Sequence, residues 1–274
     1  MEKKVFGYPQ FNEDHEMILT TYDNAYRDMM MDIRVYHLNT RESRVFLSDT
    51  EETAVLLLQG TITISCDDLV TTVSRESVFT QGPYALHAPS GHTIRVSADC
   101  EAEILVQKTI NDKNFSVRIY RPEDAPWKYS SKGCYGNVAN RRVNTILDHD
   151  IEPHSNMVLG EVLNDPGNWS GYLPHRHPQP ECYFFLFDHP EGFGASFIGD
   201  QVYKSVDHSF SAIPGGELHP QAVAPGYQMY TCWMIRHLDG NPWLQTDRCE
   251  DEAYTWLHDA NFETEKNAFV KNEK

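Results

Sequence analysis

The stretch Pro174-His-Arg-His-Pro-Gln-Pro-Glu-Cys-Tyr-Phe-Phe185, followed by Pro214-Gly-Gly-Glu-Leu-His219, indicates both the fold and the chemistry of this chain. His175 and His177 are two residues apart, so on a strand their side chains point to the same face. Glu181 opens an apolar run that is typical of a strand and can reach the same point across a sheet. The last histidine follows a turn and lies on another strand. Three imidazoles and one carboxylate that converge inside a β-barrel predict a metal site.

The rest of the chain is rich in strands. Short runs of Val, Ile, Leu and Thr dominate residues 32–108, and a similar texture returns over residues 156–238, with turn residues between the runs. Many short strands with few helical periods predict an all-β fold built from sandwiches or barrels. The tail from Asp251 carries apolar residues at near-helical spacing, which predicts a short C-terminal helix: Ala253, Trp256, Leu257 and Phe262.

The two strand-rich halves can be laid over each other. Pro89-Ser-Gly91 matches Pro214-Gly-Gly216, and Glu52-Thr-Ala-Val-Leu-Leu57 matches Glu181-Cys-Tyr-Phe-Phe-Leu186. Together these matches predict two copies of one β-fold. We therefore divide the chain into an N-terminal domain (residues 1–120), a linker (121–154) and a C-terminal domain (155–274). In this alignment the first half has no metal ligand at the corresponding positions, which are Phe46, Ser48 and Ile94.

Composition excludes several classes of function. The 274 residues include 23 Lys and Arg against 40 Asp and Glu, which gives a formal net charge of −17. An acidic surface repels phosphate backbones, so we expect no nucleic-acid partner. No apolar run approaches the roughly 20 residues that span a bilayer, and the N-terminus has no signal-peptide pattern, which predicts a cytoplasmic protein with no membrane partner. The six scattered cysteines are expected to be reduced thiols.

The joint pattern HxHxxxE and PxGxxH resembles the cupin superfamily. In that superfamily the two motifs supply four metal ligands from a small β-barrel. The resemblance implies that His175, His177, Glu181 and His219 hold one divalent metal. The first half then resembles a metal-free cupin kept for architecture. The implied fold is a bicupin, with two cupin-type β-barrels or jelly rolls and one active centre in the C-terminal half.

Five further segments resemble 5-deoxy-glucuronate isomerases, and they run in family order through most of the chain. They are Arg75-Glu-Ser-Val-Phe79, Phe115-Ser-Val-Arg-Ile119, Asn140-Arg-Arg-Val-Asn144, Gly167-Asn-Trp-Ser170 and Gly226-Tyr-Gln-Met-Tyr230. The resemblance implies an aldose–ketose isomerase that converts 5-deoxy-D-glucuronate to 5-dehydro-2-deoxy-D-gluconate in myo-inositol catabolism. Only three residues separate His177 from Glu181, fewer than in many members of the family, which leaves the exact substrate open.

An isomerase of this kind needs a base that carries a proton between adjacent carbons. The candidates are Glu181, Glu161 and Glu217. It also needs a positive partner for the substrate carboxylate, and Arg141 and Arg142 are the candidates because a guanidinium binds a carboxylate through two hydrogen bonds. Hydroxyl groups for the sugar are expected from tyrosines, namely Tyr172, Tyr183, Tyr227 and Tyr230.

The metal and the alternatives stay open at this point. Zinc is the first choice, and manganese, iron and nickel also suit three imidazoles and one carboxylate. We expect a small sugar acid as the binding partner and a homo-oligomer, because sheet edges are exposed in such folds. The alternative functions are a 5-keto-4-deoxyuronate isomerase of pectin breakdown, an Fe(II) cupin dioxygenase and a non-catalytic sugar-acid binding protein. The intact ligand set favours an isomerase over a mere binding protein.

Overall fold

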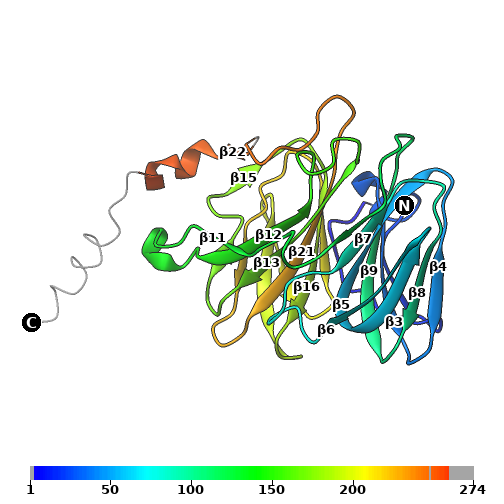
Figure 1. Ribbon diagram of the computed structural model, residues 1–274. Helices are drawn as coiled ribbons and strands as arrows, with labels where there is room; N and C mark the ends of the chain where they lie inside the picture. Colours follow the sequence, from blue (N-terminus) through cyan, green and yellow to red (C-terminus); the bar gives the residue numbers. More distant parts are fainter. Residues whose placement is uncertain (1–2, 247, 259–274) are drawn as a thin grey trace, which may run out of the picture.

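The computed structural model describes residues 3–246 and 248–258, and strands dominate these residues. Figure 1 shows two curled sheets side by side, the N-terminal one in blue to green and the C-terminal one in green to orange. The described residues include only three short helices, all of the 3-10 type: η1 (Arg27–Met29), η2 (Tyr135–Asn137) and η3 (Glu252–His258). The predicted all-β class is therefore confirmed.

The N-terminal barrel is organised around the long strand β5 (Glu51–Cys66). The first part of β5 pairs with β7 and β9, and the part after Gly60 pairs with β6 and β8. Gly60 has a φ of +101°, and a Cβ there would lie 2.6 Å from the Cα of Ala102, so only glycine fits where the strand changes partners. The other strands of this sheet are β2 (Glu16–Thr20), β3 (Asp32–Leu38), β4 (Ser43–Phe46), β6 (Leu69–Arg75), β7 (Ala85–Ala88), β8 (Ile94–Ala98), β9 (Ala102–Ile110) and β10 (Arg118–Tyr120).

The C-terminal barrel combines a seven-stranded sheet with a four-stranded sheet and a two-stranded ribbon. The seven-stranded sheet has the order β1 (Phe6–Gly7), β19 (Phe210–Ile213), β16 (Glu181–Phe187), β21 (Met229–Arg236), β13 (Met157–Asn164), β12 (Arg141–Leu147) and β11 (Lys128–Ser130). The four-stranded sheet has the order β14 (Trp169–Ser170), β20 (Gln221–Val223), β17 (Phe193–Ile198) and β18 (Gln201–Val206). The ribbon pairs β15 (His175–Arg176) with β22 (Cys249–Glu250).

The two large sheets pack against each other through one shared core. It contains Leu56 and Leu105 from the N-terminal sheet, and Phe184, Phe210 and Tyr230 from the C-terminal sheet, all almost fully buried. Strand β1 crosses over and pairs with β19 in the C-terminal sheet. Strands β11 and β12 fall inside the segment 121–154, which the sequence predicts to be a linker with an inserted strand or two. The division into two domains stays a prediction.

Strand register corrects the internal alignment by one residue. Glu181 pairs with Ile213, which directly precedes the Pro214 turn. The equivalent residue before the Pro89 turn is Ala88, and it pairs with Thr53. Thr53, and not Glu52, therefore corresponds to Glu181. Because successive strand residues face opposite sides, a slip of one residue reverses the face.

Glu52 turns towards the C-terminal half of the molecule. Its carboxylate accepts hydrogen bonds from the Ser155 hydroxyl (2.8 Å) and the Asn156 backbone N–H (2.6 Å), and lies 2.8 Å from Nε2 of His87. It contributes to the packing between the halves and not to the interior of the N-terminal barrel.

The end of the described chain forms the 3-10 helix η3. It lies where the sequence predicts a short terminal helix, with Leu257 buried and Trp256 exposed. Phe262, the fourth residue of that prediction, lies outside the described residues. None of the described helices is long and apolar enough to cross a membrane. All six cysteines are free thiols, as expected.

Candidate metal centre and its cavity

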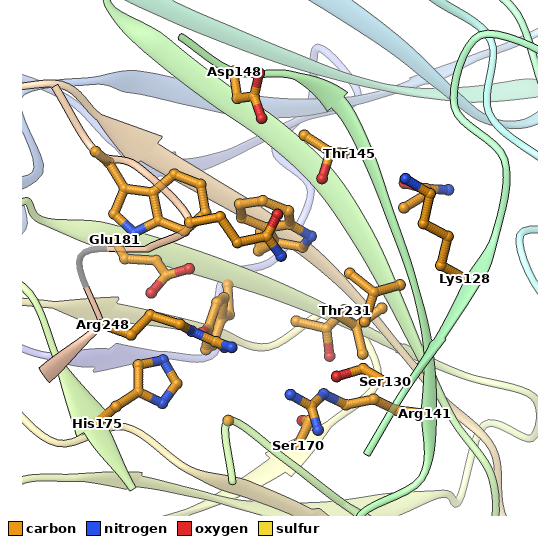
Figure 2. Close-up of a pocket in the computed structure, with 18 of the residues that line it drawn as sticks. Lys128, Ser130, Arg141, Thr145, Asp148, Ser170, His175, Glu181, Thr231 and Arg248 are labelled. Carbon is orange, nitrogen blue, oxygen red and sulfur yellow. The ribbon is translucent and has the colours of Figure 1, made fainter. Parts of the chain in front are cut away.

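A cavity of about 470 Å³ opens inside the C-terminal barrel. Its wall is built from alternate residues of neighbouring strands, which present one face to the barrel interior. Figure 2 shows side chains that converge on this space from several directions. They include Arg141 from β12, His175 from β15, Glu181 from β16, Thr231 from β21 and Arg248, which directly precedes β22.

At one end of the cavity the predicted ligands come together. The ligand atoms of His177, Glu181 and His219 all lie within 4.8 Å of one another, and all three residues are buried. Nε2 of His177 and Nε2 of His219 each lie 3.2 Å from Oε2 of Glu181. The buried His175 ring lies beside them, with its centroid 4.8 Å from that of His219. Segments 38 residues apart thus meet because β16 and β19 pair at Glu181 and Ile213.

The three imidazole rings are held in one tautomer by the backbone. In each ring Nδ1 lies within hydrogen-bond distance of a carbonyl oxygen two residues away, so Nδ1–H donates and Nε2 keeps its lone pair. The pairs are His175 with Leu173 (2.9 Å), His177 with Gln179 (3.0 Å) and His219 with Glu217 (2.8 Å). Metal-binding histidines use such outer hydrogen bonds to fix the tautomer and the ring orientation.

This donor set fits a divalent metal ion. With its proton on Nδ1, Nε2 of His219 is a buried acceptor without a hydrogen-bond donor among the described residues, and the atom that faces it at 3.2 Å, Oε2 of Glu181, is an acceptor as well. A buried nitrogen lone pair without a partner is costly, and a metal ion satisfies it. Three imidazole nitrogens with one carboxylate suit several borderline divalent ions, and they do not select one of them.

Burial controls the protonation states at this end of the cavity. Burial lowers the pKa of His175 to about 3, and the charge of Arg248 lowers it further in the same direction. Burial alone raises the pKa of Glu181, but its close contacts with the imidazoles of His177 and His219 outweigh burial and hold the pKa well below the usual range. Burial and the charge of Glu181 raise the pKa of Tyr183 well above its usual value. At neutral pH His175 is therefore neutral, Glu181 is ionised and Tyr183 is protonated.

Of the residues predicted to bind substrate, Arg141 and Tyr183 line the cavity. Arg142 does not, because it follows Arg141 on β12 and points to the other side, where it lies 3.6 Å from Asp165. Tyr172 also lies outside the lining and packs its ring against Trp169 and Tyr135. Tyr227 packs against His189 and Phe193.

Two of the three predicted catalytic carboxylates lie away from the cavity, and those assignments are corrected here. Glu161 faces the core between the two large sheets, because its neighbour Val162 occupies the cavity face of β13. Tyr230 lies on the same core face and donates a hydrogen bond of 2.8 Å to Glu161. Glu217 is exposed on the turn, and only its backbone carbonyl reaches His219. Glu181 is the one of the three that lines the cavity.

Several lining residues were not predicted. Thr231 and Trp233 share the cavity face of β21, and Ser170 and Gln221 lie on the paired strands β14 and β20. Arg248 belongs to no motif and reaches the cavity through the pairing of β22 with β15. Strand alternation would have indicated Thr231, Trp233, Ser170 and Gln221 only after it was known which face of each strand lines the cavity.

Comparisons with known proteins agree with this picture. The KduI/IolB family model matches residues 7–257. The 5-deoxy-glucuronate isomerase of Bacillus subtilis strain 168 is 26% identical over 262 residues, which cover 89% of this chain and 92% of that protein. The 5-deoxy-glucuronate isomerase of Bacillus velezensis is 28% identical over 230 residues, which cover 75% and 79%.

Solved structures show the same fold. An IolB-like protein from Salmonella typhimurium LT2 superposes with a TM-score of 0.83 at 20% identity, covering 93% of this chain and 99% of that one. The oxalate decarboxylase of Lactobacillus farciminis gives a TM-score of 0.68 at 10% identity, covering 97% and 94%. Both likenesses show the fold alone, and they confirm the predicted fold class. Because the family match runs through both barrels and the whole cavity wall, this chain belongs to the KduI/IolB family.

Proposed function

We propose that this chain is a metal-dependent aldose–ketose isomerase that converts 5-deoxy-D-glucuronate to 5-dehydro-2-deoxy-D-gluconate, as in myo-inositol catabolism. The observation that carries the proposal is the cluster of His177, Glu181 and His219 at the cavity, with His175 beside it and all three imidazoles fixed in one tautomer. Family membership and the isomerase names of the curated relatives support the class of reaction. Fold alone would not, since one fold hosts many chemistries.

In this proposal His175, His177, Glu181 and His219 hold one divalent ion, with zinc the first choice and manganese, iron or nickel compatible with the same donors. When bound, the ion acts as a Lewis acid towards the substrate carbonyl. The Nδ1–H hydrogen bonds to backbone carbonyls keep all three Nε2 atoms available for it.

The isomerisation moves a hydrogen from the carbon beside the carbonyl to the carbonyl carbon. Glu181 is the proposed base because it is the one of the three predicted carboxylates that lines the cavity, and in this role its carboxylate is only loosely held by the metal. Tyr183 remains protonated, so its hydroxyl is a hydrogen-bond donor to a sugar oxygen. Both side chains project from the same face of β16, two residues apart.

Arg141 is the proposed partner of the substrate carboxylate. Its side chain is 4% exposed and lines the cavity. Nη1 donates to the Ser131 hydroxyl at 3.2 Å and to the Ala139 carbonyl at 3.1 Å, which orients the guanidinium. Both of these acceptors are uncharged oxygens. A small sugar acid is therefore the proposed binding partner, while the predicted cytoplasmic location and homo-oligomer stay predictions.

The test is to incubate the purified, metal-analysed protein with 5-deoxy-D-glucuronate and to follow the ketose by NMR. Turnover in the wild type that is lost in a His175→Ala/His219→Ala variant, together with its metal, supports the proposal. Absence of turnover in fully metal-loaded protein contradicts the proposed substrate. 5-Keto-4-deoxyuronate and iron-dependent oxygen uptake then test the two alternative reactions.

A further inference from the structure

The last described strand is joined to the strand that carries a proposed metal ligand. In the ribbon of β15 and β22, His175 pairs with Glu250 and Arg176 pairs with Cys249. The ends are held by two more contacts: the Asp251 backbone N–H donates to the Pro174 carbonyl at 3.0 Å, and Arg176 forms a 2.9 Å ion pair with Asp251. This pairing therefore positions the residue before β22 at the wall of the cavity.

That residue is Arg248, and it lines the same cavity as Arg141. Figure 2 shows the two side chains entering from different sides, with Arg248 beside His175 and Glu181, and Arg141 above Ser170. The carboxylate of Asp148, another lining residue, lies beside Thr145 in a different part of the view. The two guanidiniums thus face the same cavity from different sides.

The two positive charges influence each other. Burial lowers the pKa of Arg141 to about 10, and the charge of Arg248 contributes in the same direction. The hydrogen bonds of Arg141 go to uncharged oxygens, the Ser131 hydroxyl and the Ala139 carbonyl. Arg141 is almost fully buried, and a buried guanidinium is costly unless an anion compensates its charge, whereas Arg248 is exposed and reaches the same cavity from the solvent side.

We propose that Arg141 and Arg248 together bind one carboxylate group of the substrate, and that Arg248, supplied by the C-terminal strand, makes the cavity select sugar acids over neutral sugars. This rests on the proposed function in that it names the specificity of the same site. A planar guanidinium on each side matches the two oxygens of a carboxylate. Arg248 thereby becomes a specificity-determining residue that no motif in the sequence marks.

The experiment measures binding by titration calorimetry on the full-length, metal-loaded protein. The probes are D-glucuronate and D-glucose, which differ at C6 by a carboxylate in place of a CH₂OH group. We expect the wild type to prefer D-glucuronate. In Arg248→Gln the dissociation constant for D-glucuronate should rise about ten- to hundredfold, while weak binding of D-glucose stays unchanged. Arg248→Lys should recover part of the loss, since it keeps the charge and loses the two-pronged geometry.

Two control variants separate recognition from packing. Arg176→Gln removes the ion pair that holds β15 and β22 together and leaves Arg248 in place, so it should weaken D-glucuronate binding far less than Arg248→Gln. Arg142→Gln removes a charge next to Arg141 that points out of the cavity, and it should bind like the wild type. An equal loss in Arg176→Gln and Arg248→Gln would mean that the strand pairing matters and not the guanidinium, which overturns the proposal.

The outcome also separates this inference from the proposed reaction. Suppose that the wild type does not convert 5-deoxy-D-glucuronate, but that Arg248→Gln binds D-glucuronate more weakly than the wild type does. The carboxylate site then stands and the proposed substrate fails. If the wild type does convert it, Arg248→Gln should raise KM about tenfold or more and change kcat much less. The same D-glucuronate dissociation constant in wild type and Arg248→Gln, including no measurable binding in either, contradicts the inference.

Discussion

Arg75 and Glu161, 86 residues apart in the chain, form a fully buried ion pair between the two barrels. Nη1 of Arg75 donates to Oε1 of Glu161 at 2.7 Å, and Nη2 donates to Oε2 at 3.1 Å, so the ion pair is bidentate. Asn144 and Tyr230 donate to the same carboxylate at 2.9 and 2.8 Å. This carboxylate is saturated with hydrogen bonds, and it connects the sheets without facing the cavity.

We predict that Glu161→Leu destabilises the protein and does not behave like the loss of a catalytic base. Removing one partner of a buried pair leaves the Arg75 charge uncompensated and costs about 3–5 kcal/mol. Urea unfolding measures this loss. The double variant Arg75→Met/Glu161→Leu should recover most of it, because neither charge is then buried alone. If folded Glu161→Leu lost about a hundredfold or more in kcat with unchanged stability, Glu161 would act as a base after all.

A second prediction distinguishes a ligand from the residue that orients it. His219→Ala should lose the bound metal, since it removes a buried donor atom of the cluster. Glu217→Ala should keep both metal and activity, because only the backbone carbonyl of residue 217 contacts His219. Elemental analysis after dialysis gives the metal content, and removal of the metal with a chelator should abolish activity in both wild type and Glu217→Ala. Loss of metal from Glu217→Ala would show that its carboxylate has a role that the present geometry does not include.

The third prediction compares two buried tyrosines on neighbouring strands. Tyr183→Phe should lower kcat/KM about tenfold with little change in stability, because its hydroxyl lies at the cavity and not in the core between the sheets. Tyr230→Phe should instead lower the free energy of unfolding by about 1–3 kcal/mol, since it removes a hydrogen bond to a buried charge. Steady-state kinetics and urea unfolding on both variants give the comparison. The reverse pattern would place substrate on the other face of the sheet.

The sequence predicts that the three clustered histidines and Glu181 come together because their signal is local. His175 and His177 lie two residues apart, and the period of a strand then fixes a common face whatever the rest of the fold. The proline-glycine turn before His219 marks the second strand in the same way. The tautomers cannot be predicted from the sequence, because the carbonyl that accepts from each Nδ1 depends on how the chain turns at that histidine.

The facing side of buried strands is what the sequence does not reveal. Strands β13 and β21 are buried on both faces, so hydrophobic residues do not alternate with polar ones along them. Glu161 and Tyr230 therefore have no local feature that assigns them to the core and not to the cavity. The same absence of alternation in β5 explains the one-residue error that matched Glu52 with Glu181. Arg248 depends on a pairing between strands more than 70 residues apart, such as Arg176 with Cys249, and no local pattern encodes it.

The fourth prediction concerns pH and a histidine that links the two halves. Nδ1 of His208 lies 2.6 Å from Oδ2 of Asp207, and Nε2 lies 3.1 Å from an oxygen of Glu103 on β9. Burial alone lowers the pKa of His208, but the hydrogen bonds to Asp207 and Glu103 outweigh it and raise the pKa from 6.5 to about 10. The folded protein therefore holds this proton more tightly than the unfolded chain.

Because the folded pKa is the higher one, the linkage stabilises the fold fully below about pH 6.5 and is lost as the pH rises towards about 10. We expect His208→Gln to be less stable than the wild type at about pH 6, and the difference to shrink steadily up to about pH 10. Urea unfolding across this range measures it, with His189→Gln, a substitution of an exposed histidine of the same barrel, as the matched control. A stability difference that stays constant or grows with pH would mean that His208 is neutral in the folded protein, and that the contact with Glu103 joins the barrels as a hydrogen bond between uncharged imidazole and carboxylate.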